Sequence, residues 1–187
     1  MIHEMNHKWW HDKEGKRLQR NKGELLCLIH SEISEWFDGE IEDLMDDKLL
    51  HRKMGEVEAA DAFIRTLDYA KGFNHDIYKA GLRYGVSDFI DLNHFFKCAL
   101  FTDAMIAELK IHGVSLIHRQ ISRVMENERK NQPEVAENLF LLLLQIAALC
   151  RLRDYDLNEA FIEKCQFNQT RHDHTHEARE QANGKKW

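Results

Sequence analysis

This sequence of 187 residues has little proline, no closely paired cysteines and no excess of positive charge. A single proline and nine glycines exclude collagen-like and proline-rich disordered chains and favour helices over sheets. The four cysteines form no Cys-x-x-Cys pair, which argues against a disulfide framework and favours a reducing compartment. A net charge of -6 argues against general binding to nucleic acid, because that function needs a basic face.

Long hydrophobic segments are also missing. The longest apolar run, Leu139–Leu144, is far too short to cross a bilayer. The first ten residues contain no apolar core of signal-peptide length. We therefore expect a cytoplasmic protein with no membrane partner, whose 187 residues form one domain with a substantial core.

Two pairs of acidic residues are the most informative feature that is present. They are Glu32-x-x-Glu35 and Glu58-x-x-Asp61, each within an apolar pattern of helical period. The spacing puts the two side chains of each pair on one face of a helix. Two neighbouring helices that direct four carboxylates into a shared seam need cations there, and such oxygen ligands suit Mg²⁺ or Mn²⁺. The pattern predicts metal-dependent phosphate chemistry, and two solvated acidic faces are the alternative.

The residues around these acids form a set of motifs. Residues 20–26 lead into 28–35, a charged loop covers 45–52, and the second acidic pair lies within 56–65. Later come Glu163-Lys164-x-x-x-Asn168-x-x-Arg171-x-Asp173-His174 and the closing Gly184-Lys185-Lys186-Trp187. Together they resemble the MazG-like all-α NTP pyrophosphohydrolases, relatives of the dimeric dUTPases, in the short form found in phages and bacteria. The resemblance covers roughly residues 8–80 and 156–187.

The resemblance implies a reaction, the hydrolysis of a nucleoside triphosphate between its α and β phosphates to a monophosphate and pyrophosphate. It implies that Mg²⁺, or Mn²⁺ in its place, is held by the four acids Glu32, Glu35, Glu58 and Asp61. One acid of the first pair would also orient or deprotonate the attacking water. By analogy the substrate is a deoxynucleotide and the role is control of the nucleotide pool, while the base stays open.

Basic and amide side chains complete the expected site. The C-terminal motif implies that Lys164, Asn168 and Arg171 contact phosphate or sugar, with Lys185 in the closing segment. In the charged loop, Lys48 and Arg52 are the residues expected to reach the nucleotide. A charged surface loop without a ligand is the alternative.

The apolar and capping patterns predict an all-α fold with a four-helix-bundle-type core. The predicted helices span about 21–39, 55–72, 77–85, 88–113, 115–131, 133–153 and 156–169. Within the single domain 1–187, residues 1–85 would form the metal-binding half, 86–167 a second helical half and 168–187 a basic tail that closes the site.

The second half resembles a degenerate copy of the first. Residues 95–103 echo 23–32, 133–137 echo 55–59, and 156–160 echo 76–80. In this register Ile106 stands for Glu35 and Leu139 for Asp61, so one competent site per chain is expected. A duplication would let one chain supply a core that family members assemble from two chains, so a homodimer stays open. Chance similarity between amphipathic helices is the alternative.

Three further interpretations remain open. A non-catalytic module that binds a nucleotide or a protein is the alternative function. The histidines near both ends, such as His174 and His176, suggest a metal tract, although a solvated polar tail explains them as well. Trp9 and Trp10 could stack on a base or seal the core, and we expect at least one of them to be a core residue.

Overall fold

The computed structural model describes residues 2–86, 95 and 102–183. This part of the chain contains helices and no strand, which confirms the all-α prediction. Its elements are α1 (Ile2–Met5), α2 (His7–Trp10), α3 (Lys22–Ile41), α4 (Met54–Gly72), α5 (Ile77–Arg83), α7 (Asp103–His112), α8 (Val114–Arg129), α9 (Val135–Leu152), α10 (Leu157–Thr170), the 3-10 helix η1 (His172–His174) and α11 (His176–Glu180).

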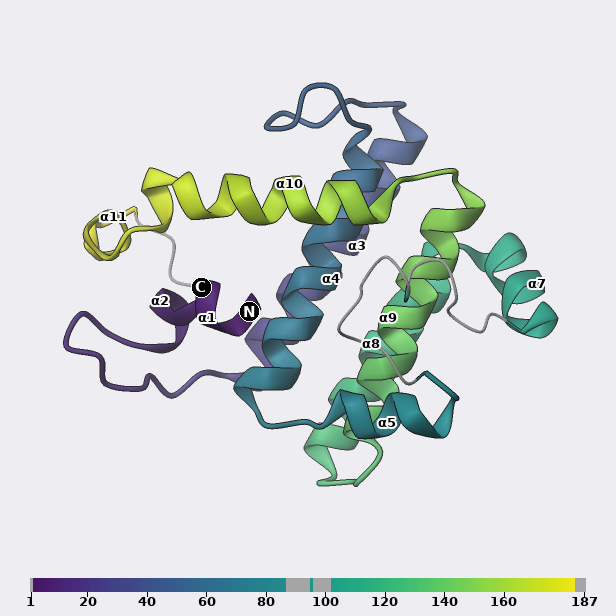
Figure 1. Ribbon diagram of the computed structural model, residues 1–187, viewed down its shortest axis with the longest axis horizontal. Coiled ribbons are helices and arrows are strands. Elements are labelled where there is room, and N and C mark those ends of the chain that lie inside the picture. Colours follow the sequence, from purple (N-terminus) through teal and green to yellow (C-terminus); the bar gives the residue numbers. More distant parts are fainter. Residues whose placement is uncertain (1, 87–94, 96–101, 184–187) are drawn as a thin grey trace.

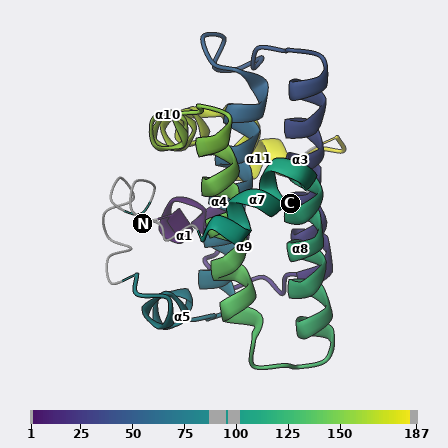
Figure 2. The ribbon, with the colours of Figure 1, turned by 90° about the vertical axis from the view of Figure 1, so that its right-hand side faces the viewer.

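The four helices α3, α4, α8 and α9 form the core. Helix α3 packs on α4 and α8 packs on α9, and the two hairpins meet through contacts of α3 with α8 and of α4 with α9 (Figures 1 and 2). Apolar side chains at helical spacing fill the interior, and those of Ile33, Phe63, Ile121 and Leu142 are fully buried. Burial of each such side chain stabilises the fold by about 1.5–3 kcal/mol.

Two outer helices cross this core. Helix α10 packs across α4, and α5 packs on α9 at the other end (Figure 1). Each begins at an aspartate cap: Asp76 accepts a hydrogen bond from the backbone of Lys79 at 2.9 Å, and Asp156 accepts one from Glu159 at 3.1 Å. The crossing of α10 over α4 brings the C-terminal motif to the acidic pairs.

Most helix ends lie where the caps predict them. Asn21 caps α3, accepting hydrogen bonds from Gly23 N and Glu24 N, and α4 ends at Gly72. The prediction of one helix over 88–113 is wrong at Thr102, whose extended backbone and side-chain cap on Met105 N start α7 at Asp103. Residues 87–94 and 96–101 of that predicted helix lie outside the described part.

Helix α9 is long and apolar enough to cross a membrane by length and composition alone. It lies in the helical core, however, with 61% of its residues buried against the rest of the protein. This is the environment of a core helix.

The N-terminal segment packs against the end of α4 through Trp10. Its indole is 2% exposed and donates a hydrogen bond from Nε1 to Asp68 at 3.0 Å. Gly72 lets the ring approach, because a Cβ built on that glycine would lie 2.2 Å from the Trp10 ring. Of Trp9 and Trp10, Trp10 is therefore the buried one.

Replacing Gly72 with alanine should lower the free energy of unfolding by about 1–3 kcal/mol, because the added methyl group forces the Trp10 indole out of its place. Lys71→Ala, at the exposed neighbouring position, should change it by less than about 0.5 kcal/mol. Denaturant unfolding of both variants measures the difference. Equal stabilities would contradict the packing described for Trp10.

Candidate metal and phosphate site

Three of the predicted acids meet between α3 and α4. Glu32, Glu58 and Asp61 each offer a carboxylate oxygen within 4.8 Å of the others. Glu32 and Glu58 are only 6% and 7% exposed. The i, i+3 spacing places these side chains on the facing sides of two packed helices, and the resulting oxygen-only cluster suits a hard divalent cation.

Glu35 lies apart from this cluster. It is exposed on α3 and lines the same hollow of about 670 Å³ into which the three acids face. The structure thus brings together three of the four predicted ligands and leaves Glu35 at their solvent side.

Two basic side chains offset part of the buried negative charge. Arg65 donates from Nε to Glu32 at 2.6 Å, and Lys164 Nζ lies 2.8 Å from Asp61 Oδ2. Burial is the largest single effect and lowers the pKa of the Lys164 ammonium, but the charge and hydrogen bond of Asp61, together with the charges of Glu58 and Asp46, outweigh it and raise the pKa. Lys164, predicted from the C-terminal motif, is therefore placed at the acids by α10.

The environment of the acids raises their pKa values and so favours their protonated forms. Burial, a hydrogen bond with Glu32 and the charge of Asp61 raise the pKa of Glu58. Burial also raises the pKa values of Asp61 and Glu35, aided by the neighbouring carboxylates. Like charges this close disfavour full ionisation unless a cation joins them. The cluster therefore favours a shared proton or a metal ion.

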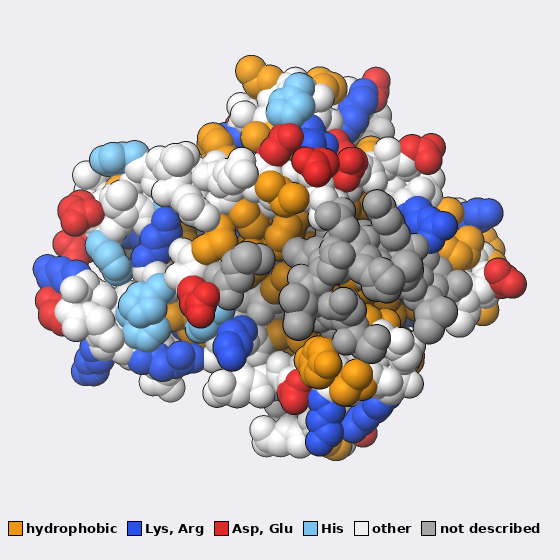
Figure 3. Space-filling model, in the orientation of Figure 1, with side chains coloured by type: hydrophobic (Ala, Val, Ile, Leu, Met, Phe, Trp, Pro, Cys, Tyr) orange, Lys and Arg blue, Asp and Glu red, His pale blue; other side chains and the backbone are white. Residues whose placement is uncertain are grey.

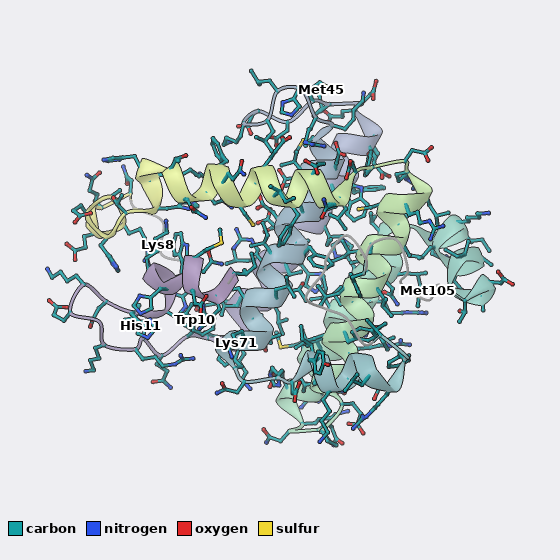
Figure 4. The ribbon with its side chains drawn as sticks, viewed as in Figure 1. Lys8, Trp10, His11, Met45, Lys71 and Met105 are labelled. Atoms are coloured by element: carbon teal, nitrogen blue, oxygen red, sulfur yellow. The ribbon has the colours of Figure 1, made fainter. Side chains whose placement is uncertain are left out.

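The loop after α3 forms one wall of the same hollow. Asp46 is 1% exposed, and its Oδ1 accepts hydrogen bonds from the backbone of Lys48 at 2.9 Å and of Leu49 at 2.5 Å. This turn directs Lys48 to the hollow, where its ammonium also pairs with Asp47. The labelled Met45 marks the loop above α10 in Figure 4 and lines the hollow too. Lys48 is thus placed where a phosphate ligand would be needed.

Arg52, the other predicted loop residue, is used differently. Its guanidinium donates two hydrogen bonds of 2.9 Å to Glu163 on α10 and one of 3.1 Å to Glu56 on α4. It does not line the hollow. Its side chain is 12% exposed and bound to both carboxylates, so it fixes α10 to α4. Contact of Arg52 with a nucleotide stays a prediction.

A second hollow adjoins the acids beneath the end of α10. The two share Asp61, Arg65 and Arg171 in their walls. Asn168 lines the second hollow, and its Oδ1 is buried with no hydrogen-bond partner among the described residues. Arg171 makes two hydrogen bonds with Asp173, at 2.9 and 2.6 Å. Asn168 thus lies in the second hollow, and Arg171 lies at the wall between the two hollows.

Aromatic rings form the floor of this second hollow, which we call the tryptophan hollow. Trp9 and Trp10 line it together with His174. The Trp9 and His174 rings meet edge to face at 5.1 Å, and the Arg179 guanidinium stacks 4.1 Å over Trp9. Lys8 and Trp10 lie below the far end of α10 in Figure 4. The N-terminal segment therefore faces the C-terminal motif.

Arg65 is the site residue that the sequence reasoning missed. It follows Asp61 by one helical turn, so the acidic motif itself places it on the same face of α4. The signal in the sequence was an arginine four residues after Asp61, on the helix face that carries the second acidic pair. Its 2.6 Å hydrogen bond to Glu32 makes it part of the charge balance of the cluster.

Lys185 and the histidines are the remaining predicted features. Lys185 lies outside the described residues. Histidines gather with basic side chains at the end formed by α1, α2 and α11 in Figure 3. Within the described part of the chain, the acid triad is the one group of three or more ligands that could hold a metal ion.

Comparisons with protein-family models, with curated proteins and with solved structures find no match for this chain.

Without metal, the free energy of unfolding should fall as the pH rises from about 5 to about 8. The Glu58 carboxyl, whose pKa is raised in the folded protein, binds its proton more tightly there than in the unfolded chain, so ionisation favours unfolding. Glu58→Gln should remove much of this slope and be more stable than the wild type by about 1 kcal/mol or more at pH 8.

Thermal and urea unfolding in EDTA across this pH range measures the effect. The matched control is Glu126→Gln on α8, because Arg129 and Lys130 lower the pKa of exposed Glu126 to about 2 and it stays ionised throughout. An unchanged slope in Glu58→Gln would show that the acids are not strained by their mutual charge.

Proposed function

We propose that the protein is a divalent-metal-dependent hydrolase of nucleoside triphosphates that cleaves between the α and β phosphates. The observation that carries the proposal is that Lys164 and Arg171 line the same hollow as the buried Glu32 and Glu58 and the half-buried Asp61. Acidic and basic side chains in one hollow suit a metal–polyphosphate complex, which carries both signs of charge.

Glu32, Glu58 and Asp61 would hold the metal, because they supply oxygen ligands within reach of one centre. A bound Mg²⁺ or Mn²⁺ would polarise phosphate oxygens and lower the pKa of a bound water. Arg65 would keep Glu32 oriented through its 2.6 Å hydrogen bond. Lys164 would exchange its contact with Asp61 for a phosphate oxygen as the cation takes over that carboxylate.

Glu35 is suited to a different role. It borders the hollow on the solvent side of the cluster, where an attacking water would enter. Burial and the charge of Glu32 raise its pKa, which makes its carboxylate a better proton acceptor near neutral pH. We assign Glu35 to orienting and deprotonating that water.

The phosphate chain and the nucleoside would occupy the two hollows. Lys48 and Lys164 would contact the phosphates above the acids, and Arg171, in both walls, would bridge to the tryptophan hollow. Asn168 would meet the sugar or base there through its buried Oδ1. A deoxynucleotide is the proposed substrate class, by analogy to the MazG-like enzymes alone.

The proposed setting is the cytoplasm. Cys27, Cys150 and Cys165 are free thiols, and Cys27 is exposed on α3, as expected for a reducing compartment. Control of the nucleotide pool is the role that this location and reaction would fit.

A screen of canonical and modified NTPs and dNTPs with Mg²⁺ tests the reaction. Phosphate is read with malachite green, with and without added inorganic pyrophosphatase. Signal that needs the coupling enzyme supports α–β cleavage and identifies the substrate. Orthophosphate released without it would mean a different bond, and silence with metal bound would leave a non-catalytic nucleotide- or protein-binding module as the function.

Asp61→Asn and Glu35→Gln should each lower kcat by at least about 100-fold while the helical circular dichroism stays unchanged, since each removes a carboxylate from the reacting centre. Asp61→Asn should also weaken Mn²⁺ binding, whereas Glu35→Gln should retain most of it. Asp38→Asn, on the exposed side of α3, is the matched control with unchanged activity. Full activity in Asp61→Asn would contradict the assignment.

Asn168→Ala should raise KM by about 10-fold or more with a smaller change in kcat, because the lost hydrogen bond serves the nucleoside rather than the reacting phosphate. The increase should differ between substrates that differ in sugar or base. Thr170→Ala, exposed at the end of the same helix, serves as the control. A uniform loss of kcat across substrates would place Asn168 at the phosphates.

A further inference from the structure

We infer that α8, α9 and α10 repeat α3, α4 and α5 about a pseudo-twofold axis, and that the repeat contains a neutralised counterpart of the acid cluster. In this counterpart Gln120 stands for Glu32, Asn138 for Glu58 and Leu141 for Asp61. Restoring the three acids would create a second divalent-cation site. The identity of its ligand rests on the proposed function, whereas the equivalence of the two halves does not.

The first evidence is a match between α3 and α8. Residues 28–34 read LIHSEIS and residues 116–122 read LIHRQIS, so five of the seven positions are identical. Ile29 and Ile33 are buried in α3, as are Ile117 and Ile121 in α8. The hydroxyl of each segment's last serine donates to the backbone oxygen of its histidine at 3.0 Å. In this register Gln120 takes the place of Glu32.

The second evidence is the turn that follows each hairpin. Asn74 after α4 has a positive φ of 60°, and Asp154 after α9 has 56°. The residue after each donates an equivalent backbone hydrogen bond to the preceding helix. These bonds run from His75 N to Ala70 O at 2.8 Å and from Tyr155 N to Cys150 O at 3.0 Å. The aspartate caps of α5 and α10 come next. The shift between these turns is 80 residues, which pairs Glu58 with Asn138.

This register differs from the one expected from the sequence. The pairing of 156–160 with 76–80 has the same shift of 80 residues. The pairing of 133–137 with 55–59 has a shift of 78, which is two residues too small for α9. Neither α4 nor α9 is interrupted, so no insertion can absorb the difference. Likewise Asp103 starts α7 next to an extended Thr102, whereas its expected counterpart Glu32 lies inside α3. Leu141, not Leu139, therefore corresponds to Asp61.

The arrangement in space has the contacts of a twofold axis. Equivalent residues meet at such an axis, and His30 and His118 do so through the same atom, Nδ1 to Nδ1 at 2.8 Å, with rings 14° from parallel. The third helix of each repeat packs on the other repeat, α10 on α4 and α5 on α9. Figure 2 shows α10 and α5 at opposite ends of the layer formed by α4 and α9.

Amides in the counterpart remove the need for a cation. Gln120 is 1% exposed, and its Nε2 donates to Asn138 Oδ1 at 2.8 Å and to the Asn138 backbone oxygen at 2.9 Å. Asn138 Nδ2 donates to Glu134 O at 2.9 Å. Gln120 is buried and Asn138 is half-buried, and an amide pair that is hydrogen-bonded in this way carries no net charge. This pair therefore needs no cation.

The basic groups of the acid cluster have disappeared in parallel. Arg65, which pairs with Glu32, corresponds to Gln145. Lys164 on α10 corresponds to Tyr84, which lies just past the end of α5 at Arg83. Loss of both cations together with the three acids is the pattern expected where a charged centre has been neutralised as a unit.

The division of labour follows from this arrangement. The acids of the working site come from α3 and α4 of the first repeat, while Lys164 and Asn168 come from α10 of the second and Arg171 is the C-cap of α10. The second repeat thus contributes the basic and amide side chains of the site and covers the apolar face of the first. Each chain completes one site within itself.

The direct test restores the acids with Gln120→Glu, Asn138→Glu and Leu141→Asp together. Mn²⁺ binding, measured by electron paramagnetic resonance and calorimetry, should increase by one ion per chain over the wild type, and Mn²⁺ should raise the thermal midpoint more than in the wild type. Ser115→Glu with Ser122→Glu, on the exposed face of α8, is the control that adds charge outside the counterpart. A folded triple variant without additional Mn²⁺ overturns the inference, whereas a wild type that binds no Mn²⁺ overturns the proposed function instead.

A mirror variant decides the case if the triple variant does not fold. Glu32→Gln with Glu58→Asn transfers the amide pair into the first repeat. The two substitutions should be coupled favourably: the thermal midpoint of the double variant should be higher than the sum of the two single-variant shifts predicts. The double variant should also bind no Mn²⁺ at this site. Additive or unfavourable coupling overturns the equivalence of the two positions.

Discussion

Burial of negative charge between α3 and α4 is the constraint on which the rest of the structure depends. Carboxylates removed from water and left unpaired are strongly destabilising. Arg65 supplies one counter-charge from within α4, but the other comes from Lys164 on α10. Helix α10 must therefore lie across α4, where Arg52 also fixes it through Glu56 and Glu163. The charge balance of the site therefore depends on the position of α10.

The second half of the protein shows the other solution to the same packing problem. At the corresponding depth between α8 and α9, Gln120 and Asn138 satisfy each other as neutral amides. The first half keeps carboxylates at these positions although amides would pack there at lower electrostatic cost. Carboxylates kept in one half alone are expected at a functional site, because their electrostatic cost does nothing for structural stability.

The sequence allowed the prediction of the all-α fold and of the meeting of Glu32, Glu58 and Asp61, because helical period and caps act locally. The pairing of Arg52 with Glu163 could not be predicted, because these residues are far apart in the sequence and the crossing of α10 brings them together. The helix break at Thr102 was missed because its extended backbone depends on one side-chain cap. The match of 28–34 to 116–122 was visible in the sequence, but a comparison guided by the acids passes over it.

The most direct measurement is an anomalous difference map from crystals grown with Mn²⁺, compared with the metal-free protein. The account predicts a peak coordinated by Glu32, Glu58 and Asp61, with Lys164 Nζ displaced from Asp61 and no peak at Gln120 and Asn138. Absence of a peak at the acids, with Mn²⁺ bound elsewhere or not at all, would contradict the metal centre and the hydrolase built on it.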